Sequence, residues 1–469
     1  MSHKKQIVVI GGGITGLTAA YYLQKEIDTN QLPYEVKLIE ASDRLGGKIK
    51  SLKRDGFTIE RGPDSFLIRK KSAAELAKDV GLEDKLIKNG TGQSYILVND
   101  HLHKMPSGSF MGVPTQVKPF LSSSLFSWRG KIRAGLDFVL PKGKEQSDQS
   151  LGLFFRRRLG DEIVENVIEP LLSGIYAGDI DDLSLMSTFP NFYELEQEHQ
   201  SLVKGLQKTT PKPQKPQPNA KKPSMFYSLE NGLESLIHAI ESKLPEGTVL
   251  KSTQVDEVNL HDSQYALVLK NQKTIQADAV VMATPYFATA KMLGSYPFVE
   301  PLNQMKATSV ANVALAFDAS AIEKDIDGTG FVVSRNSSYR ITACTWVHKK
   351  WPNSTPKGKV LLRCFVGKPD DQEVVDLLDE EIIDIALKDL KRIMNITAEP
   401  NFSVVTRWKQ AMPQYSVGHK LRLESVREGI KRELPGLFLA GSSYDGIGIP
   451  DCIDQGKVAV EQVLAFLKE

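Results

Sequence analysis

Residues 6–23, QIVVIGGGITGLTAAYYL, decide the fold that we expect for the first part of the chain. A signal peptide needs an uninterrupted apolar stretch, and three consecutive glycines break this one at its centre. Residues 6–10 therefore predict a short buried strand, and residues 17–23 have the apolar pattern of a helix. Between them, Gly11, Gly13 and Gly16 have the spacing of a phosphate-binding turn that joins a strand to a helix.

Each glycine of this turn has its own role. The first makes the tight turn, the second lets the backbone approach a pyrophosphate, and the third lets the helix pack on the strand. The N-terminus of the helix then offers free N–H groups and a positive dipole to the phosphates. An ordinary glycine turn of an α/β protein is the alternative, so the assignment needs support from the rest of the chain.

That support comes from the next segment. Residues 34–40, YEVKLIE, predict a second strand that ends in Glu40, where a carboxylate can accept hydrogen bonds from a ribose hydroxyl pair. The chain continues as EASDRLGGKIK, and its residues 44–48, RLGGK, are the second half of a signature seen in FAD-dependent flavoproteins of the amine-oxidase type. Together, the two halves predict an FAD-binding domain.

Composition limits the remaining function classes. A chain of 469 residues suggests two or three domains, and 41% hydrophobic with 25% charged residues is typical of a soluble globular protein. The formal net charge of +2 does not indicate a nucleic-acid partner. Cys344, Cys364 and Cys452 fit neither a disulfide framework nor a zinc site, so a reducing cytoplasm and no metal are expected. No apolar run approaches the roughly 18 to 20 residues of a spanning helix, so any membrane contact is expected to be peripheral.

The expected fold class is α/β, or α+β overall, with a discontinuous Rossmann-like FAD-binding domain, an inserted substrate-binding domain and a helical cap domain. Residues 207–224 carry five lysines and five prolines and predict a flexible linker. Three segments form the predicted FAD-binding domain: 1–70, 225–289 and 426–469. The predicted substrate domain consists of 71–99 and 290–425, the helical cap of 100–206 and the linker of 207–224.

Apolar and basic residues are mixed within residues 109–141 of the cap, SFMGVPTQVKPFLSSSLFSWRGKIRAGLDFVLP. This mixture is typical of a surface that docks on an anionic bilayer, here at the inner face of the cell membrane. A cap whose apolar side is simply core is the alternative. Residues 154–172, FFRRRLGDEIVENVIEPLL, predict an amphipathic helix, and its three consecutive arginines are expected to form a solvated face.

Three further segments make a resemblance specific: IERGPDSF at 59–66, PLLSGIYAGD at 170–179 and SYDGIGIPDCIDQGKVAV at 443–460. With the dinucleotide motif, they resemble the flavoprotein porphyrinogen oxidases of heme biosynthesis, most closely the Gram-positive bacterial type. The resemblance runs nearly end to end and is weakest in the linker and after residue 290.

The resemblance implies an activity. Coproporphyrinogen III would be oxidised to coproporphyrin III by removal of six electrons, with dioxygen reoxidising FAD to give hydrogen peroxide. Protoporphyrinogen IX is the alternative substrate, and flavin amine oxidation is the second alternative. Against amine oxidation, the C-terminal glycine loop lacks the cysteine that tethers flavin in some amine oxidases, and Tyr444 has no evident partner for an amine cage. Transient contact with the next enzyme of the heme pathway is also implied.

The resemblance implies the residues of the site as well. For Val255 and Trp408 the residues alone indicate only a strand core and a buried aromatic. The residues expected to bind FAD non-covalently are Gly11, Gly12, Gly13, Ile14, Thr15, Gly16, Glu40, Ala41, Lys48, Gly62, Pro63, Asp64, Ser65, Val255, Trp408, Ile447, Gly448 and Ile449. Pro450 suits the first turn of the helix that follows.

A porphyrinogen needs an apolar slot with cationic groups at its mouth. The resemblance implies that backbone at Gly174 approaches the macrocycle, with Ile175 and Tyr176 as walls and Lys71 facing a propionate. A solvated lysine is the alternative at residue 71. No catalytic triad is suggested, because hydride removal by a flavin depends on position and electronics more than on a strong base.

Overall fold

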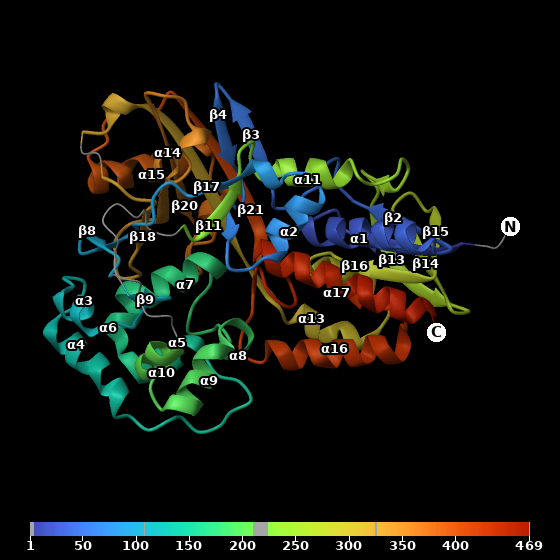
Figure 1. Ribbon diagram of the computed structural model, residues 1–469, viewed down its shortest axis with the longest axis horizontal. Helices are drawn as coiled ribbons and strands as arrows, with labels where there is room; N and C mark the ends of the chain where they lie inside the picture. The colour runs from blue at the N-terminus through green and yellow to red at the C-terminus, as the bar shows by residue number, and fades with distance from the viewer. Residues whose placement is uncertain (1–3, 107, 210–223, 324–325, 469) are drawn as a thin grey trace. The chain divides into compact units, whose positions relative to one another are not determined.

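A computed structural model describes residues 4–106, 108–209, 224–323 and 326–468 (Figure 1). The chain forms two compact units. Unit 1 consists of Met1–Lys88, Met225–Met305 and Lys420–Glu469, and unit 2 consists of Asn89–Ser224 and Lys306–His419. The finer division into a cap and a substrate domain stays a prediction. Helix α10 (Leu202–Thr209) enters the segment predicted as a linker, and residues 210–223 of that segment lie outside the described residues.

Unit 1 is built on a parallel sheet of five strands. Its order is β12 (Val249–Leu250), β2 (Tyr34–Ile39), β1 (Lys5–Ile10), β16 (Ala279–Met282) and β22 (Leu437–Leu439). The two strands predicted at 6–10 and 34–40 are confirmed as β1 and β2. The chain crosses from one side of β1 to the other, and in such sheets ligands bind at the carboxyl ends of the strands where the order reverses. The loop after β1 is therefore the expected ligand position.

Two long helices of unit 1 pack on each other beside this sheet (Figure 1). Helix α1 (Ile14–Asn30) follows the glycine turn, and α17 (Ile449–Lys468) ends the described chain. Gly456 of α17 permits close contact, because a Cβ there would lie 2.7 Å from the carbonyl oxygen of Thr15. The other helices of unit 1 are α2 (Ser72–Asp79), α11 (Glu234–Glu241), α12 (Tyr286–Met292), α13 (Glu300–Asn303) and α16 (His419–Glu433).

Small antiparallel sheets complete unit 1. They are the pair β3 (Ser51–Arg54) and β4 (Phe57–Glu60), the sheet β5 (Phe66–Leu67), β11 (Phe226–Leu229) and β6 (Leu86–Lys88), and the meander β13 (Val255–His261), β14 (Gln264–Leu269) and β15 (Thr274–Ala277).

Unit 2 contains a mixed sheet of seven strands. Its order is β21 (Phe402–Gln414), β17 (Lys306–Asp318), β20 (Lys359–Val366), β19 (Ile341–Trp346), β18 (Gly330–Val333), β7 (Tyr95–Val98) and β8 (His101–Lys104). Neighbouring strands are antiparallel except β18 and β7. Helix α15 (Asp379–Met394) buries Ile382, Ala386 and Leu390, which recur every four residues, in the apolar core of this sheet.

The rest of unit 2 is mainly helical. Its helices are α3 (Val117–Ser122), α4 (Trp128–Gly135), α5 (Leu151–Leu159), α6 (Asp161–Ile163), α7 (Glu169–Tyr176), α8 (Leu185–Thr188), α9 (Pro190–His199), α10 and α14 (Val347–Lys350), with the strand pair β9 (Ser109–Phe110) and β10 (Val113–Pro114). Among the described residues, no helix combines the length and the apolar character needed to cross a bilayer.

The single amphipathic helix predicted for residues 154–172 is wrong. Gly160, with a φ of 87°, ends α5, because its left-handed backbone cannot continue the helix. A second helix then begins at Asp161, and its middle turn, Val164–Ile168, is π-helical. The glycine in the pattern was the signal for this break.

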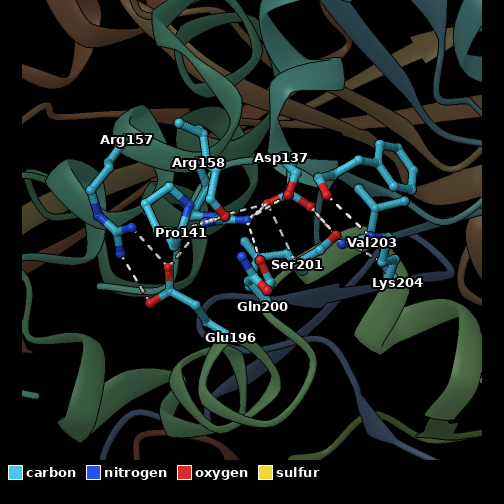
Figure 2. A network of polar contacts seen from close by, with 12 residues as sticks. Asp137, Pro141, Arg157, Arg158, Glu196, Gln200, Ser201, Val203 and Lys204 are labelled. Carbon is cyan, nitrogen blue, oxygen red and sulfur yellow. Dashed lines mark hydrogen bonds and ion pairs between the residues drawn. The ribbon is translucent and has the colours of Figure 1, made fainter. Parts of the chain in front are cut away.

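The expectation that the three arginines form a solvated face is also wrong. Arg158 is fully buried and lies among the helices of unit 2 (Figure 2). Its Nε donates to Asp137 Oδ1 at 2.6 Å, and its other N–H groups reach four carbonyl oxygens, those of Asp137, Leu140, Pro141 and Gln200. Arg157 and Arg158 both contact the buried carboxylate of Glu196. Burial of an arginine is tolerated here because all five donors are paired.

Candidate functional site

The three motif glycines differ in why they must be glycine. A Cβ at Gly16 would lie 1.9 Å from the carbonyl oxygen of Gly11, and Gly11 itself has a φ of 105°. Gly16 is therefore required by the close approach of the helix to the turn, and Gly11 by the backbone conformation of the turn itself. Gly13 has an ordinary φ of −70°, and a Cβ there would meet no atom of the described residues within 4 Å. Nothing in the polypeptide requires glycine at 13, so the open space fits a ligand that approaches the backbone.

The N-terminus of α1 borders this space. Gly13 is the N-cap and has no side chain to accept hydrogen bonds from the first-turn amides, and the first intrahelical bond runs from Leu17 N–H to Gly13 C=O at 2.9 Å. Ile14 and Thr15 are buried. A buried helix start without a side-chain cap calls for another acceptor, and its partial positive charge favours an anion. A diphosphate meets both requirements.

The second half of the signature lies against the first. Gly46 N–H donates to Gly12 C=O at 2.8 Å, and a Cβ at Gly47 would lie 3.3 Å from Gly13 Cα. The segment 44–48 therefore lies beside the glycine turn. The two halves of the signature, which together predict an FAD-binding domain, form one structure.

Glu40 stabilises the glycine turn through hydrogen bonds and also offers an acceptor for a ligand. Its Oε2 accepts the N–H of Gly12 at 2.6 Å, and its Oε1 accepts the N–H and Oγ of Ser42, both at 2.8 Å. These bonds use three of about four lone-pair sites of the carboxylate, which leaves one for a ribose hydroxyl. Ala41 beside it is exposed.

Val255 also lies near this position. Two residues before it, Thr253 N–H donates to the carbonyl oxygen of Glu40 at 2.9 Å. Val255 begins β13 and is buried. The backbone two residues before Val255 is thus tied to Glu40, a contact that the sequence did not reveal, and the role of Val255 toward FAD stays a prediction.

Lys48 is connected to the C-terminal loop. Its Nζ donates to Ser442 Oγ at 3.2 Å, and burial lowers the pKa of Lys48. The loop is held at both ends by Gln455 of α17, whose Oε1 accepts from Gly441 N–H at 2.8 Å and whose Nε2 donates to Gly446 C=O at 3.2 Å. Gln455 was not among the predicted site residues, because nothing in the local sequence distinguishes it from a surface glutamine.

Asp451 organises the turn that contains Ile447, Gly448 and Ile449. A Cβ at Gly448 would lie 2.7 Å from Asp451 Oδ2, so the turn is folded tightly around this carboxylate. Lys70 forms an ion pair with Asp451. Helix α17 begins at Ile449 with Pro450 in its first turn, as the proline predicts. Asp451 was not among the predicted site residues.

The turn at residues 62–65 and the nearby lysine also lie in unit 1. Gly62 and Pro63 are half-buried, whereas Asp64 is buried and accepts a hydrogen bond from Ser65 Oγ at 2.7 Å. Lys71 is the exposed N-cap residue of α2. Its proposed contact with a substrate carboxylate stays a prediction.

Four predicted site residues lie in unit 2. Gly174 and Ile175 are exposed on α7, and a Cβ at Gly174 would meet no atom of the described residues within 4 Å. Tyr176 is buried, with its ring centroid 5.8 Å from that of Tyr415. Trp408 is half-buried in β21, opposite Val310. All other predicted FAD residues belong to unit 1.

Comparison with known proteins gives the family. The model for flavin-containing amine oxidoreductases matches residues 14–464. The chain is 55% identical to coproporphyrinogen III oxidase of Bacillus subtilis over 99% of both chains, and 45% identical to that of Staphylococcus aureus over 99% of this chain and 100% of the other.

The fold agrees with this match. A crystal structure from Exiguobacterium sp. 255-15 shares 38% identity with a TM-score of 0.87, covering 99% of both chains. The expected fold class and the resemblance to porphyrinogen oxidases are confirmed. The chain therefore belongs to the family of flavin-containing amine oxidoreductases and is an oxidoreductase with a flavin cofactor.

Proposed function

We propose that the protein is an FAD-dependent oxidase that converts coproporphyrinogen III to coproporphyrin III. Six electrons leave the substrate, dioxygen accepts them, and hydrogen peroxide is the product. The observation that carries the proposal is the identity, over nearly the whole chain, to the two bacterial oxidases of this name. The open position at Gly174 supports it, since a bulky macrocycle can approach the backbone there.

The residues of unit 1 fit FAD bound without a covalent link. The space at Gly13 and the uncapped amides of α1 suit a diphosphate, and Glu40 suits a ribose. A covalent link through Cys452 is disfavoured, because burial raises the pKa of this thiol to about 11 and the thiolate is the reactive form. When bound, FAD supplies hydride acceptance and reoxidation by dioxygen.

The chain's own residues then bind and orient the substrate. Ile175 offers an exposed apolar side chain beside Gly174, and Lys71 offers an ammonium group to a propionate. Removal of hydride needs correct placement more than an added base, so we assign binding roles and no catalytic acid or base to these residues.

The substrate assignment is tested by offering the two porphyrinogens separately, prepared anaerobically, and following fluorescence of the oxidised ring. We expect faster turnover of coproporphyrinogen III at matched low concentration. Lys71→Ala should raise KM for this tetracarboxylate more than for the dicarboxylate protoporphyrinogen IX, by about five- to thirtyfold or roughly 1 to 2 kcal/mol. Faster turnover of protoporphyrinogen IX by the wild-type enzyme would overturn the assignment, and turnover of amines alone would favour the second alternative.

Gly174→Ala separates a binding role from a structural one. Alanine is favoured over glycine inside a helix by roughly 0.5 to 1 kcal/mol, and the added Cβ meets no described atom, so the variant should be at least as stable as wild type. We expect kcat/KM for the porphyrinogen to fall by about tenfold or more, which is roughly 1.4 kcal/mol. Gly135→Ala is the matched control, since its Cβ also enters open space near the end of a helix, and it should keep full activity. Equal activity of both variants would remove Gly174 from the substrate site.

We further propose a cytoplasmic protein that docks on an anionic bilayer. Trp128, Ile132 and Leu136 recur every four residues along α4 and the turn after it, with exposed fractions of 69%, 69% and 42%. Arg129 is an exposed basic residue of the same helix, whereas the neighbouring Lys131 is buried and its Nζ donates to the carbonyl oxygen of Leu121 at 2.7 Å. Exposed apolar residues beside basic ones favour anionic interfaces.

Cosedimentation with vesicles tests this docking. Wild type should bind vesicles that contain phosphatidylglycerol more than vesicles of phosphatidylcholine alone, and Trp128→Ala with Ile132→Ala should abolish the difference. Equal recovery of wild type and variant in the anionic pellet would refute it. Contact with the next enzyme of the heme pathway stays a prediction.

A further inference from the structure

The helix that carries Gly174 contains a defect in its backbone hydrogen bonding. Within the π-helical turn Val164–Ile168, Glu169 N–H donates to Val164 C=O, five residues back. The next residue, Pro170, has no N–H, so it cannot continue this pattern to the carbonyl of Glu165. Ser334 Oγ donates to that carbonyl instead, at 3.2 Å. A residue from another element thus supplies the bond that the proline removes.

Ser334 begins a run of three residues that all bind this helix. Directly after β18, Asn336 Nδ2 donates to Glu165 Oε2 at 2.7 Å, and Arg335 Nη1 donates to Glu169 Oε1 at 2.8 Å. We call residues 334–336 the clamp. Through it, the end of one sheet strand is tied to the point where the helix changes from π to α.

Arg335 also holds the far end of the segment. The chain leaves α7 at Ala177, whose φ of 50° reverses its direction, and returns to place Asp179 Oδ2 2.9 Å from Arg335 Nη2. One guanidinium therefore bridges Glu169 and Asp179. The residues between these two contacts include Gly174, Ile175 and Tyr176.

Two carboxylates compete for this guanidinium. Burial opposes ionisation of Asp179, but hydrogen bonds from Arg335 and from the Asp181 amide hold its pKa below the usual value. Glu169 is more deeply buried, and this burial raises its pKa to about 7 despite the opposing effect of Arg335. No described residue hydrogen-bonds Glu169 Oε2, which is buried and can carry the proton.

We propose that Glu169 and the clamp are positioning residues, which hold Gly174, Ile175 and Tyr176 in place for the substrate and hold them more tightly when Glu169 is ionised. The inference rests on the proposed function, in which these three residues contact the porphyrinogen. It adds a site that controls substrate affinity from outside the binding surface.

The sign of the pH dependence follows from the strength of the Arg335 contact. Below about pH 7, Glu169 is a neutral acceptor for the Arg335 guanidinium, and above it the same hydrogen bond joins two opposite charges and is stronger. KM should therefore fall as pH rises from about 6 to 8. The charged groups that face Glu169 are Arg335, Asp179 and Arg156, with Asp181 at 4.0 Å from Arg335. The pKa of Asp179 is lowered and those of Arg156 and Arg335 are raised, so these three groups keep their charge across this range.

Arg335→Ala tests the clamp on the holoenzyme, with Arg340→Ala as the matched control. Arg340 pairs with Asp371 at the surface of the same unit, and the two arginine side chains are 43% and 44% exposed. Loss of Arg335 should raise KM for coproporphyrinogen III about tenfold, roughly 1.4 kcal/mol, with kcat within about twofold. Arg335→Lys should recover part of the loss. The clamp is refuted if Arg335→Ala matches Arg340→Ala in KM.

Glu169→Gln tests the titration and keeps an acceptor for Arg335. The fall in wild-type KM between pH 6 and 8 should disappear in this variant, and persistence of the same fall would overturn the role of Glu169. Should Arg335→Ala not fold, Arg335→Lys and Glu169→Gln still decide the question.

Amide hydrogen exchange of residues 164–179, measured on the holoenzyme without substrate, does not depend on the proposed activity. Arg335→Ala should exchange faster there than Arg340→Ala. Unchanged exchange overturns the clamp alone, whereas absence of porphyrinogen turnover by the wild type overturns the proposed function and with it the substrate part of the inference.

Discussion

Gly13→Val should leave the protein folded and empty of flavin. Valine adopts the φ of −70° and ψ of 175° found at this residue, and its Cβ meets no described atom within 4 Å. Replacing glycine as the N-cap costs at most about 1 kcal/mol of helix stability. The side chain would instead fill the space that we assign to the diphosphate and block bonds from the amides of α1. Loss of two such charge-assisted bonds costs about 3 kcal/mol or more, so FAD affinity should fall by at least about a hundredfold.

The measurement is a titration of apoprotein with FAD, followed by visible absorbance of the bound flavin. Gly135→Val serves as the control, because a side chain there also enters open space, and it should bind FAD as wild type does. Gly16→Val should behave differently from both and fail to fold, since its Cβ would lie 1.9 Å from the carbonyl oxygen of Gly11. Full flavin content in Gly13→Val would contradict the phosphate site.

The parts of the fold that sequence reasoning predicted are those set by local chemistry. A strand, a glycine turn and a helix follow one another in residues 6–23, and each is specified by backbone conformation within a few residues. The start of α17 is similar, because Pro450 is tolerated in the first turn of a helix but not in its interior. In each case, the residues of the segment itself are enough to predict its structure.

The contacts that sequence reasoning missed join residues far apart in the chain. Gln455 closes the loop 441–446 through two backbone groups, and Asp451 pairs with Lys70 across 381 positions. The clamp is of the same kind, since Ser334 compensates for a proline more than 160 residues earlier. Polar side chains of this type have no periodic pattern, and their partners are decided only when the fold brings the segments together.

The arginine run shows how a local pattern misleads. Three adjacent arginines on a helix normally include a solvated face, and Arg157 remains 37% exposed in accordance with that rule. Arg158 is 0% exposed because Asp137, buried on a different segment, supplies a counter-charge. Asp137 also accepts from Ser201 Oγ at 2.5 Å and from Val203 N–H at 3.0 Å, so it caps α10 (Figure 2). The pair therefore connects helices that the sequence gives no reason to connect.

Arg158→Ala should consequently be among the most destabilising substitutions in unit 2. It leaves Asp137 as a buried charge without its cation and removes donors from four carbonyl oxygens. Breaking a buried pair in this way costs about 3 to 5 kcal/mol. In a unit of this size, that loss corresponds to a fall of roughly 10 °C in thermal midpoint, which we would measure by circular dichroism on the holoenzyme.

Arg157→Ala is the matched control, because it removes the neighbouring arginine from the same network. Its guanidinium is 37% exposed, and Arg158 remains 3.4 Å from the buried Glu196 carboxylate after it is gone, so the cost should be smaller than for Arg158→Ala, which removes the cation of Asp137 and the donors to four carbonyl oxygens. Arg158→Met tests the charge separately from the volume. Methionine fills the cavity but leaves the Asp137 carboxylate without its cation, so this variant should be nearly as destabilising as Arg158→Ala. Equal midpoints for Arg157→Ala and Arg158→Ala would mean that Asp137 is held by its helix-capping bonds alone, and the buried pair would then lose its role in joining these helices.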